Sequence, residues 1–199
     1  MLAGMMTDAP PARSAQFDVL LVGSVEPLVV STCSLVRDGD AVIVVDPGLA
    51  PSQAAILDPL RAHGVDPRDV TDVVLSHHHP DHALNVGLFP AARVHDHWAI
   101  YDFAGHWHDS EAEGRILAPS VRLLRTPGHS NEDISTMVGT AEGVIVCTHL
   151  WWREDGPADD PFAPDPGVLH GSRRRVLELA NVIVPGHGAP FVPADTTPG

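Results

Sequence analysis

The sequence contains no lysine, so all 12 basic side chains of this 199-residue chain are arginines. Aspartate and glutamate number 26, and the formal net charge is −14. A surface this acidic repels phosphate backbones unless its basic residues are gathered in one patch. The only basic run is Arg173-Arg174-Arg175, which is short and fits the solvated face of a helix. The charge therefore disfavours nucleic acid as a partner.

Long apolar runs and cysteines are also scarce. No apolar run approaches the ~20 residues of a membrane-spanning helix, and the first 16 residues lack the basic and apolar regions of a signal peptide. Cys33 and Cys147 lie in strand-like apolar runs, where buried free thiols are expected. Free thiols fit a reducing compartment, so we expect a cytoplasmic protein without membrane association. We expect residues 1–16 to form a flexible tail and residues 17–199 a single domain.

Strand-like and helix-like segments are interleaved along the chain. Short apolar runs predict strands at 17–23, 28–36, 41–46, 72–76, 121–126, 133–139, 143–148 and, with a following loop, 181–188. Helical patterns cover 51–64, begin within 81–89 and return at 167–180. We expect Pro59 to break the first helix in two. This mixture predicts a layered α/β fold.

The positions of the histidines in the sequence follow a pattern. Seven of the 13 histidines lie at or next to the C-terminal end of a predicted strand: His77, His78, His79, His82, His129, His149 and His187. Loops that follow strands can bring side chains from a rigid scaffold to one cavity. A Pro-Gly pair precedes both His129 and His187 and provides a tight turn. One such histidine is ordinary, but four separate loops of this kind predict a metal site.

The stretch "HHHPDH" at residues 77–82 carries the densest part of the pattern. Side chains alternate along extended backbone, so His77 and His79 point the same way and His78 points away. Asp81 and His82, at the start of the next helix, can turn back toward the same space.

Three motifs, "HHHPDH", "TPGHS" and "VPGHG", resemble in this order the metallo-β-lactamase superfamily over about residues 17–195. The resemblance implies a four-layer αββα sandwich with one or two metals between the sheet edges. It assigns His77, His79 and His129 to one metal. It assigns Asp81, His82 and His187 to a second. The stretches "TPGHSNEDIS" and "NVIVPGHGAPF" further resemble the metallo-β-lactamase domain-containing protein 1 group, whose eukaryotic member is linked to histone pre-mRNA processing.

One position departs from the superfamily pattern. Where a bridging Asp usually follows the strand that corresponds to "GVIVCT", this chain has His149. A carboxylate can join two cations ~3.5–4 Å apart, whereas an imidazole gives one nitrogen to one metal. With one negative charge missing, we expect one tight metal and a weak or absent second metal. Glu154 and Asp155 follow closely in the sequence and are candidate replacements.

The donor set suits zinc, with iron or manganese as alternatives. A bound metal lowers the pKa of its water toward ~7, which implies metal-assisted hydrolysis. Asp81 is the candidate catalytic residue that orients this water or accepts its proton. Asp133, four residues after His129, is a candidate supporting partner of that ligand, with an ordinary turn or surface role as the alternative.

An aromatic segment at 94–114 lies between "HHHPDH" and "TPGHS" and contains His95, His97, His106 and His108. It is either a cover over the metal site or a helix packed on the sandwich. "LWW" at 150–152 can form another wall of the site.

Three functions are compatible with these patterns. The leading one is a metallohydrolase of a small ester, thioester, lactone or related substrate. The second is an RNA or DNA phosphodiesterase with a basic patch at 173–175. The third is a mononuclear iron dioxygenase of the persulfide-dioxygenase type, or a metal-binding protein without catalysis.

Overall fold

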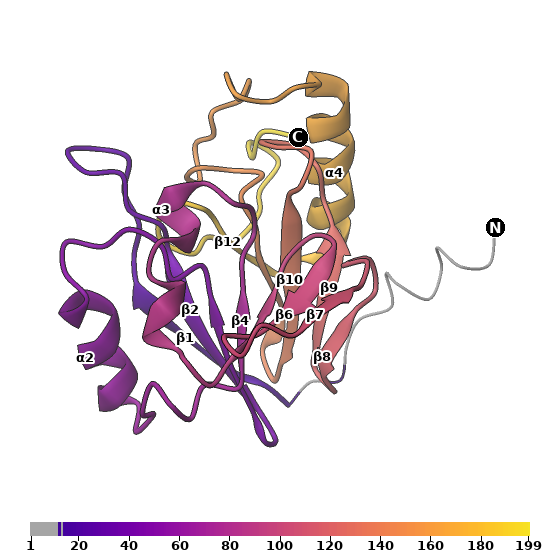
Figure 1. Ribbon diagram of the computed structural model, residues 1–199. Helices are drawn as coiled ribbons and strands as arrows, with labels where there is room; N and C mark the ends of the chain where they lie inside the picture. Colours follow the sequence, from indigo (N-terminus) through magenta and orange to yellow (C-terminus); the bar gives the residue numbers. More distant parts are fainter. Residues whose placement is uncertain (1–11, 13) are drawn as a thin grey trace.

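The computed structural model describes residue 12 and residues 14–199 (Figure 1). The tail expected over 1–16 therefore lies mainly outside the described residues. At its described end, Ala15 is buried, and its backbone N–H donates to the carbonyl of Gly139 at 3.1 Å. The first strand begins at Gln16.

Two sheets form the centre of the described chain. The first has seven strands in the order β1 (Gln16–Leu21), β2 (Cys33–Asp38), β3 (Ala41–Val45), β4 (Asp72–Val74), β5 (Arg93–His95), β6 (Ala99–Tyr101) and β7 (Trp107–Asp109). The pairs β3–β4 and β4–β5 are parallel, and the other neighbours are antiparallel.

The second sheet has five strands in the order β12 (Val182–Val184), β11 (Gly143–Cys147), β10 (Ile134–Thr140), β9 (Val121–Arg125) and β8 (Ile116–Ala118). The pair β11–β12 is parallel, and the others are antiparallel. Since β9 and β11 both run antiparallel to β10, the strands β9, β11 and β12 share one direction.

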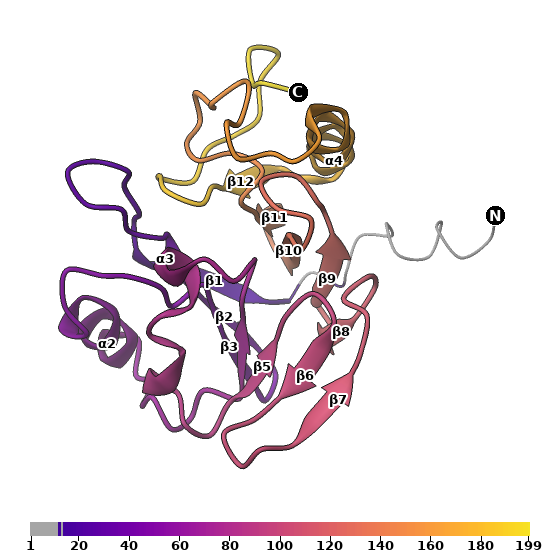
Figure 2. The same cartoon turned by 45° about the horizontal axis from the view of Figure 1, so that its top comes forward.

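Helices cover the outer faces of the two sheets. Helix α2 (Ala54–Ala62) lies beside the first sheet and α4 (Pro166–Leu179) beside the second, at opposite sides of the molecule in both views (Figures 1 and 2). The short α3 (Pro80–Ala83) and the 3₁₀ helix η1 (Val86–Leu88) connect β4 to β5. Among residues 14–199, no helix has the length and apolar character needed to cross a bilayer.

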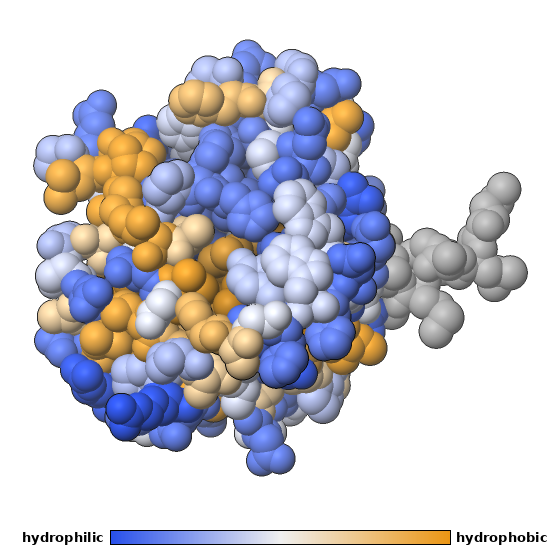
Figure 3. Space-filling view, viewed as in Figure 1, coloured by the Kyte–Doolittle hydropathy of each residue, from blue (hydrophilic) through white to orange (hydrophobic). Residues whose placement is uncertain are grey.

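Residues 22–32 form a loop between β1 and β2, so the second strand begins later than the expected residue 28. Within the loop, Ser24 and Val30 exchange two backbone hydrogen bonds, and the Thr32 N–H donates to Gly186 beyond β12 at 2.7 Å. These bonds divert the segment from the first sheet toward the second. Its apolar side chains gather at the upper left of Figure 3, and the exposed ones are Val22, Leu28 and Val29.

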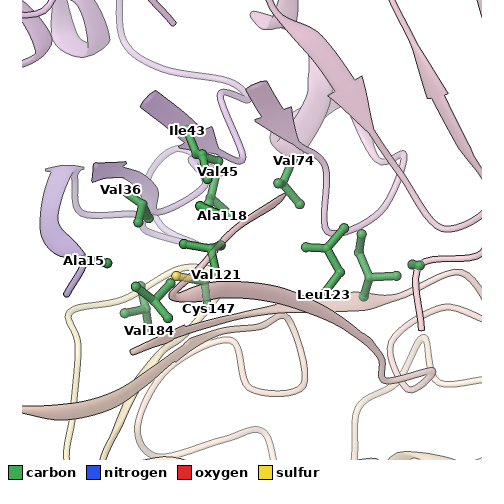
Figure 4. Close-up of a cluster of buried hydrophobic side chains, with 13 residues drawn as sticks. Ala15, Val36, Ile43, Val45, Val74, Ala118, Val121, Leu123, Cys147 and Val184 are labelled. Atoms are coloured by element: carbon green, nitrogen blue, oxygen red, sulfur yellow. The ribbon is translucent and has the colours of Figure 1, made fainter. Parts of the chain in front are cut away.

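Side chains that alternate across the strands build three apolar layers. The central layer joins inward residues of both sheets: Val36, Ile43, Val45 and Val74 from the first, and Val121, Leu123, Val138 and Val184 from the second (Figure 4). The outer layers bury Leu35, Val44 and Val73 with Ile56 and Leu60 of α2, and Leu124, Met137 and Val146 with Leu169 and Val176 of α4. The predicted αββα sandwich is confirmed.

Two local predictions were wrong. Helix α2 continues through Pro59, because Ile56 and Leu60 on either side of it are fully buried and their packing outweighs the lost backbone hydrogen bond. The segment 94–114 contains no helix and instead supplies β6, β7 and most of β5. Its apolar and polar residues alternate over short runs, which favours strands over a helix.

Candidate metal centre

Five strands end at one edge of the sandwich, and a potential ligand or ligand partner follows each of them. Asp46 follows β3, and His77 follows β4 by three residues. His129, His149 and His187 follow β9, β11 and β12. Because the strands within each of these sets share one direction, their C-terminal ends bring the side chains together. The imidazoles of His77 and His149, from different sheets, have ring centroids 4.7 Å apart.

The converging side chains form two overlapping groups of potential ligands. One nitrogen each from His77, His129 and His149 lie within 4.8 Å of one another. One ligand atom each from Asp81, His82, His149 and His187 satisfy the same limit. His149, which stands where the resemblance expects a bridging Asp, therefore belongs to both groups.

The spacing within the second group fits ligands of one ion. The Nε2 atoms of His149 and His187 are 3.1 Å apart, and Asp81 Oδ2 lies 3.2 Å from His82 Nε2 and 3.4 Å from His187 Nε2. Two atoms bound tetrahedrally to zinc at ~2.0–2.1 Å are separated by about 3.3 Å. The donor atoms are thus placed as a shared metal would require.

His79 lies at the outer side of the first group. Its Nδ1 is 3.1 Å from His129 Nε2, and its ring centroid is 4.5 Å from that of His77. Unlike His77 and His129, it is exposed. The structure therefore places His79 as the most accessible of the three histidines expected at the first metal.

Partners outside the cluster hold the buried imidazoles in place. The Nδ1 atoms of His82 and His129 lie 2.9 Å from Asp46 Oδ2 and 2.8 Å from Asp160 Oδ2. His187 Nδ1 is 2.9 Å from the carbonyl of Val30. These contacts favour protonated Nδ1 atoms and leave the Nε2 lone pairs for a metal, the arrangement usual around ligating histidines.

The surroundings of His77 show independently whether these residues suit a bound metal. Its Nδ1 is 3.1 Å from Ser76 Oγ, while its buried Nε2 has no hydrogen-bond partner among the described residues. An unpaired buried nitrogen is costly unless something binds it. Its position beside His129 and His149 suits a metal ligand.

Burial favours the neutral form of three histidines in the cluster. It lowers the pKa of His77 and His149 well below 6.5, with the neighbouring histidines adding to the effect. Burial also lowers the pKa of His187. Neutral imidazole is the form that binds metals, so these side chains need not lose a proton first.

Asp81 and His82 each shift the pKa of the other. Burial opposes charge on His82, but the charges and hydrogen bonds of Asp46 and Asp81 outweigh it and raise the pKa to about 9. Burial likewise opposes ionisation of Asp81, but the hydrogen bond and charge of His82 lower its pKa to about 2. Asp81 is therefore an anionic ligand candidate at any physiological pH.

Asp46 was not foreseen as part of the site. It takes the left-handed conformation with φ 51°, which Asp tolerates better than most residues. Its Oδ1 accepts the Ser76 N–H at 2.7 Å while Oδ2 contacts His82. A Cβ on Gly48 would lie 1.6 Å from the carbonyl oxygen of Asp81, so this turn presses directly on the ligand segment. In the sequence, Asp46-Pro47-Gly48 follows an apolar run and indicates a turn, which gives no sign of a ligand partner.

Asp160 was also missed, because it lies in an irregular loop without periodicity. Its Oδ2 accepts from Trp152 Nε1 at 2.9 Å as well as contacting His129. The expected partner, Asp133, instead accepts from the backbone N–H and hydroxyl of Ser130 at 2.9 and 2.6 Å. Burial raises the pKa of Asp133 to about 6. Asp133 supports the turn after His129, whereas Asp160 contacts the imidazole.

Other candidate residues lie outside the ligand groups. His78 points away from the cluster, with Nδ1 3.1 Å from Glu132 Oε2 and Nε2 3.3 Å from Asp96 Oδ2. Glu154 and Asp155 are exposed, and Asp155 pairs with Arg153 at 3.2 Å. Neither carboxylate replaces the missing bridge.

A cavity of about 280 Å³ opens onto the ligand groups. Its lining residues are Val25, Val29, His79, Asp81, His129, His149, Trp152, Phe162 and His187. A second hollow of about 380 Å³ shares His79, His129 and Phe162 and adds Ser130, Asn131, Glu132 and Pro164. Among the described residues, neither lining includes an arginine.

The aromatic walls come only partly from the segments expected. The side chain of Trp152 lines the cavity and stacks on Phe162, with centroids 5.9 Å apart. Trp151 is buried in the apolar layer under α4. The strands of 94–114 contribute no residue to the lining of either hollow, so the segment does not cover the cavity.

Comparisons with known proteins identify the family to which the chain belongs. The sequence model of the Metallo-beta-lactamase superfamily matches residues 27–189. The Metallo-beta-lactamase domain-containing protein 1 of Xenopus laevis is 37% identical over 162 residues, covering 77% of this chain and 69% of its own length. The Homo sapiens protein of the same name is 40% identical over 159 residues. The chain spans 59% of the human protein, and the match covers 75% of this chain.

Solved structures share the fold. A metallo-beta-lactamase-family protein from Thermotoga maritima has a TM-score of 0.71 at 21% identity, covering 91% of this chain and 100% of that one. A quorum-quenching N-acyl homoserine lactone lactonase has a TM-score of 0.63 at 22% identity, covering 90% and 93%. A protein crystallised in a di-iron-bound form has a TM-score of 0.63 at 24% identity, covering 86% and 94%.

Proposed function

This chain belongs to the metallo-beta-lactamase superfamily, and we propose that it is a metal-dependent hydrolase of a small ester, thioester, lactone or related substrate. The observation that carries the proposal is the apolar cavity over the ligand groups. Val25, Val29, Trp152 and Phe162 form its apolar wall, and no arginine is present in its described lining. Such a wall suits an uncharged acyl group better than a polyanion.

We propose zinc as the cofactor, bound tightly at one position with a second, weaker position beside it. The six histidines and Asp81 that surround the site provide the nitrogen and oxygen donors that zinc prefers. Iron and manganese accept the same donors and are the alternatives. One structural neighbour was crystallised in a di-iron-bound form, which supports iron as an alternative metal for this fold.

A divalent metal bound here would supply a hydroxide at neutral pH and polarise the scissile carbonyl. The residues of the chain supply the remaining functions. Asp81 is ionised, so it can orient the attacking water through a hydrogen bond and accept its proton. The aromatic wall of Trp152 and Phe162 would hold the acyl group against the ligands and exclude bulk water.

The nucleic-acid alternative has less support. Of the proposed basic patch, Arg173 is fully buried and Arg175 Nη2 pairs with Glu113 Oε1 at 2.7 Å. Only Arg174 is exposed among the three. A patch that should draw in a phosphate backbone is therefore mostly engaged within the fold.

A cytoplasmic location is part of the same proposal. Both cysteines are free and buried, and burial raises the pKa of each thiol. Inert, reduced thiols agree with a reducing compartment.

The test combines metal analysis with a substrate panel. Protein purified without added metal is analysed for zinc, iron and manganese, then assayed on p-nitrophenyl esters, a thioester, a γ-lactone and bis(p-nitrophenyl) phosphate. We expect zinc and an acyl-substrate activity that His129→Ala abolishes. Turnover of the phosphodiester alone would overturn the substrate class. Iron with oxygen consumption and no hydrolysis would establish the dioxygenase alternative.

A further inference from the structure

Arg173 is a charged side chain with no exposed surface, although it belongs to the sequence's one basic run. From α4 its guanidinium donates to three backbone carbonyls: Nε to Leu150 at 3.0 Å, Nη1 to Ala158 at 2.6 Å and Nη2 to Pro157 at 2.7 Å. The group also lies 5.4 Å from the ring centroid of Trp151. A buried cation is expensive unless it is fully hydrogen-bonded, and here every one of these bonds holds the loop 150–160.

That loop contacts one ligand of each candidate group. Through its side chains, Trp152 donates to Asp160, and Asp160 contacts His129 Nδ1. Through its backbone, the carbonyl of Trp152 accepts the His187 N–H at 2.8 Å, and that of Trp151 accepts the Gly186 N–H at 3.0 Å. The position of His129 and the backbone of His187 both depend on where this loop lies.

We propose that Arg173 is a positioning residue for the metal centre, which fixes the 150–160 loop and thereby sets the orientation of His129 through Asp160. The inference rests on the proposed metal binding but not on any particular substrate. The planar fork of arginine suits the role, because its three nitrogens reach three carbonyls that a single ammonium group could not bind together.

The helix that carries Arg173 also braces the turn before His129. Ser172 Oγ donates to the carbonyl of Pro127 at 2.7 Å. Added at Gly128, a Cβ would lie 2.8 Å from Leu169 Cδ1, so helix and turn are in close contact. Helix α4 therefore supports the ligand from two directions, while the adjacent Arg174 points into solvent and provides a matched control.

The first test measures metal affinity, which does not require a known substrate. Arg173→Met, Arg173→Lys and the control Arg174→Met are titrated with zinc against a chromophoric chelator, and their folds are compared by circular dichroism. We expect both Arg173 variants to bind about 10-fold more weakly or worse, as for other supports of metal ligands. The Arg174 variant should match the parent. Parent-like affinity in both Arg173 variants would overturn the proposal.

The second test separates positioning from general loss of stability. Arg173→Met is repeated in an Asp160→Asn background, where its further effect on zinc affinity should be much smaller, because both changes act on the same path to His129. Leu60→Ala, which removes a buried side chain under α2, should lower the melting temperature without changing affinity. Full additivity with Asp160→Asn, or an equal affinity loss in Leu60→Ala, would show that Arg173 does not position the ligand.

Discussion

The Nε2 atoms of His149 and His187 lie 3.1 Å apart, although their residues follow different strands, β11 and β12. Two neutral imidazoles cannot hydrogen-bond through two lone pairs, so this approach needs a shared proton or a shared metal. Because His149 can also reach the group of His77 and His129, it stands between the two potential metal positions. It is the residue on which metal stoichiometry should depend.

We expect His149→Asp to strengthen the second metal position. The change adds one negative charge and two oxygens between two cations, where one nitrogen stood. Titration of metal-stripped protein should give about one tightly bound equivalent in the parent and about two in the variant, as a bridging carboxylate allows. Two equally tight ions in the parent would show that the chain does not need the carboxylate.

His77→Ala and His129→Ala should each remove the tight metal, since both side chains are buried at the cluster. His78→Ala serves as the control, because this side chain contacts Glu132 and Asp96 and not the ligand groups. Its metal content should remain near that of the parent. Elemental analysis of the three purified variants measures their metal content. Loss of a whole metal equivalent from His78→Ala would contradict the alternation of residues 77–79.

Gly48→Ala should disturb the site through its backbone. The new methyl group would lie 1.6 Å from the Asp81 carbonyl oxygen and 2.5 Å from His82 Cα, so the ligand segment has to move. We expect a loss of about 1–3 kcal/mol in the free energy of unfolding, typical of overpacking, together with weaker metal binding. Gly87→Ala, where a Cβ meets nothing within 4 Å, should change neither quantity. Urea unfolding and zinc titration of the pair provide the comparison.

Chelator-treated protein should lose stability as the pH falls below 6.5. Burial lowers the pKa of His77, His149 and His187 from 6.5. Below that pH the unfolded chain therefore binds protons that the folded state resists, and the free energy of unfolding decreases. His82, with its pKa raised to about 9, acts in the opposite sense only between 6.5 and 9, where the folded state holds the extra proton.

Urea unfolding of the metal-free protein over this acidic range provides the measurement. His149→Asn should show a shallower decline than the parent, because it lacks one of the buried histidines that resist protonation. A parent whose stability is constant from pH 6.5 downward would contradict the assignment of neutral, buried histidines.

Phe162→Ala should weaken binding of apolar acyl substrates. The ring is 61% exposed, stacks on Trp152 and lines both hollows beside the ligands. Loss of this contact should weaken the binding free energy of the substrate by about 1–2 kcal/mol, because less apolar surface is buried. This corresponds to a KM raised roughly 10-fold with little change in kcat. An acetyl ester, which is too short to cover the ring, should respond much less. Equal effects on short and long esters would exclude Phe162 from the acyl wall.

Local rules were enough to select from the sequence the candidate ligands that the structure brings close together. Alternation decides between His77 and His78, and Pro-Gly turns mark His129 and His187. The partners of these ligands could not be found in this way. Asp46 and Asp160 meet His82 and His129 only after strands and loops 31–36 positions apart have packed. Such pairings depend on tertiary structure, and local patterns in the sequence cannot predict them.

Secondary structure shows the same division between local and distant causes. The strands β3, β9 and β11 agree closely with their apolar runs, because each is buried on both faces. The break predicted at Pro59 does not occur in α2, because a local rule for helix breaking takes no account of the sheet that Ile56 and Leu60 pack against.

The ligand groups draw on both sheets: His77, Asp81 and His82 follow β4 of the first, and His129, His149 and His187 follow strands of the second. An ion held by these groups would tie the N-terminal half of the chain to the C-terminal half across the seam of the sandwich. Separation of the two halves would then require release of the ion. The resistance of the protein to unfolding should accordingly rise with the concentration of free metal, so that metal supply would govern how long the chain stays folded as well as how fast it works.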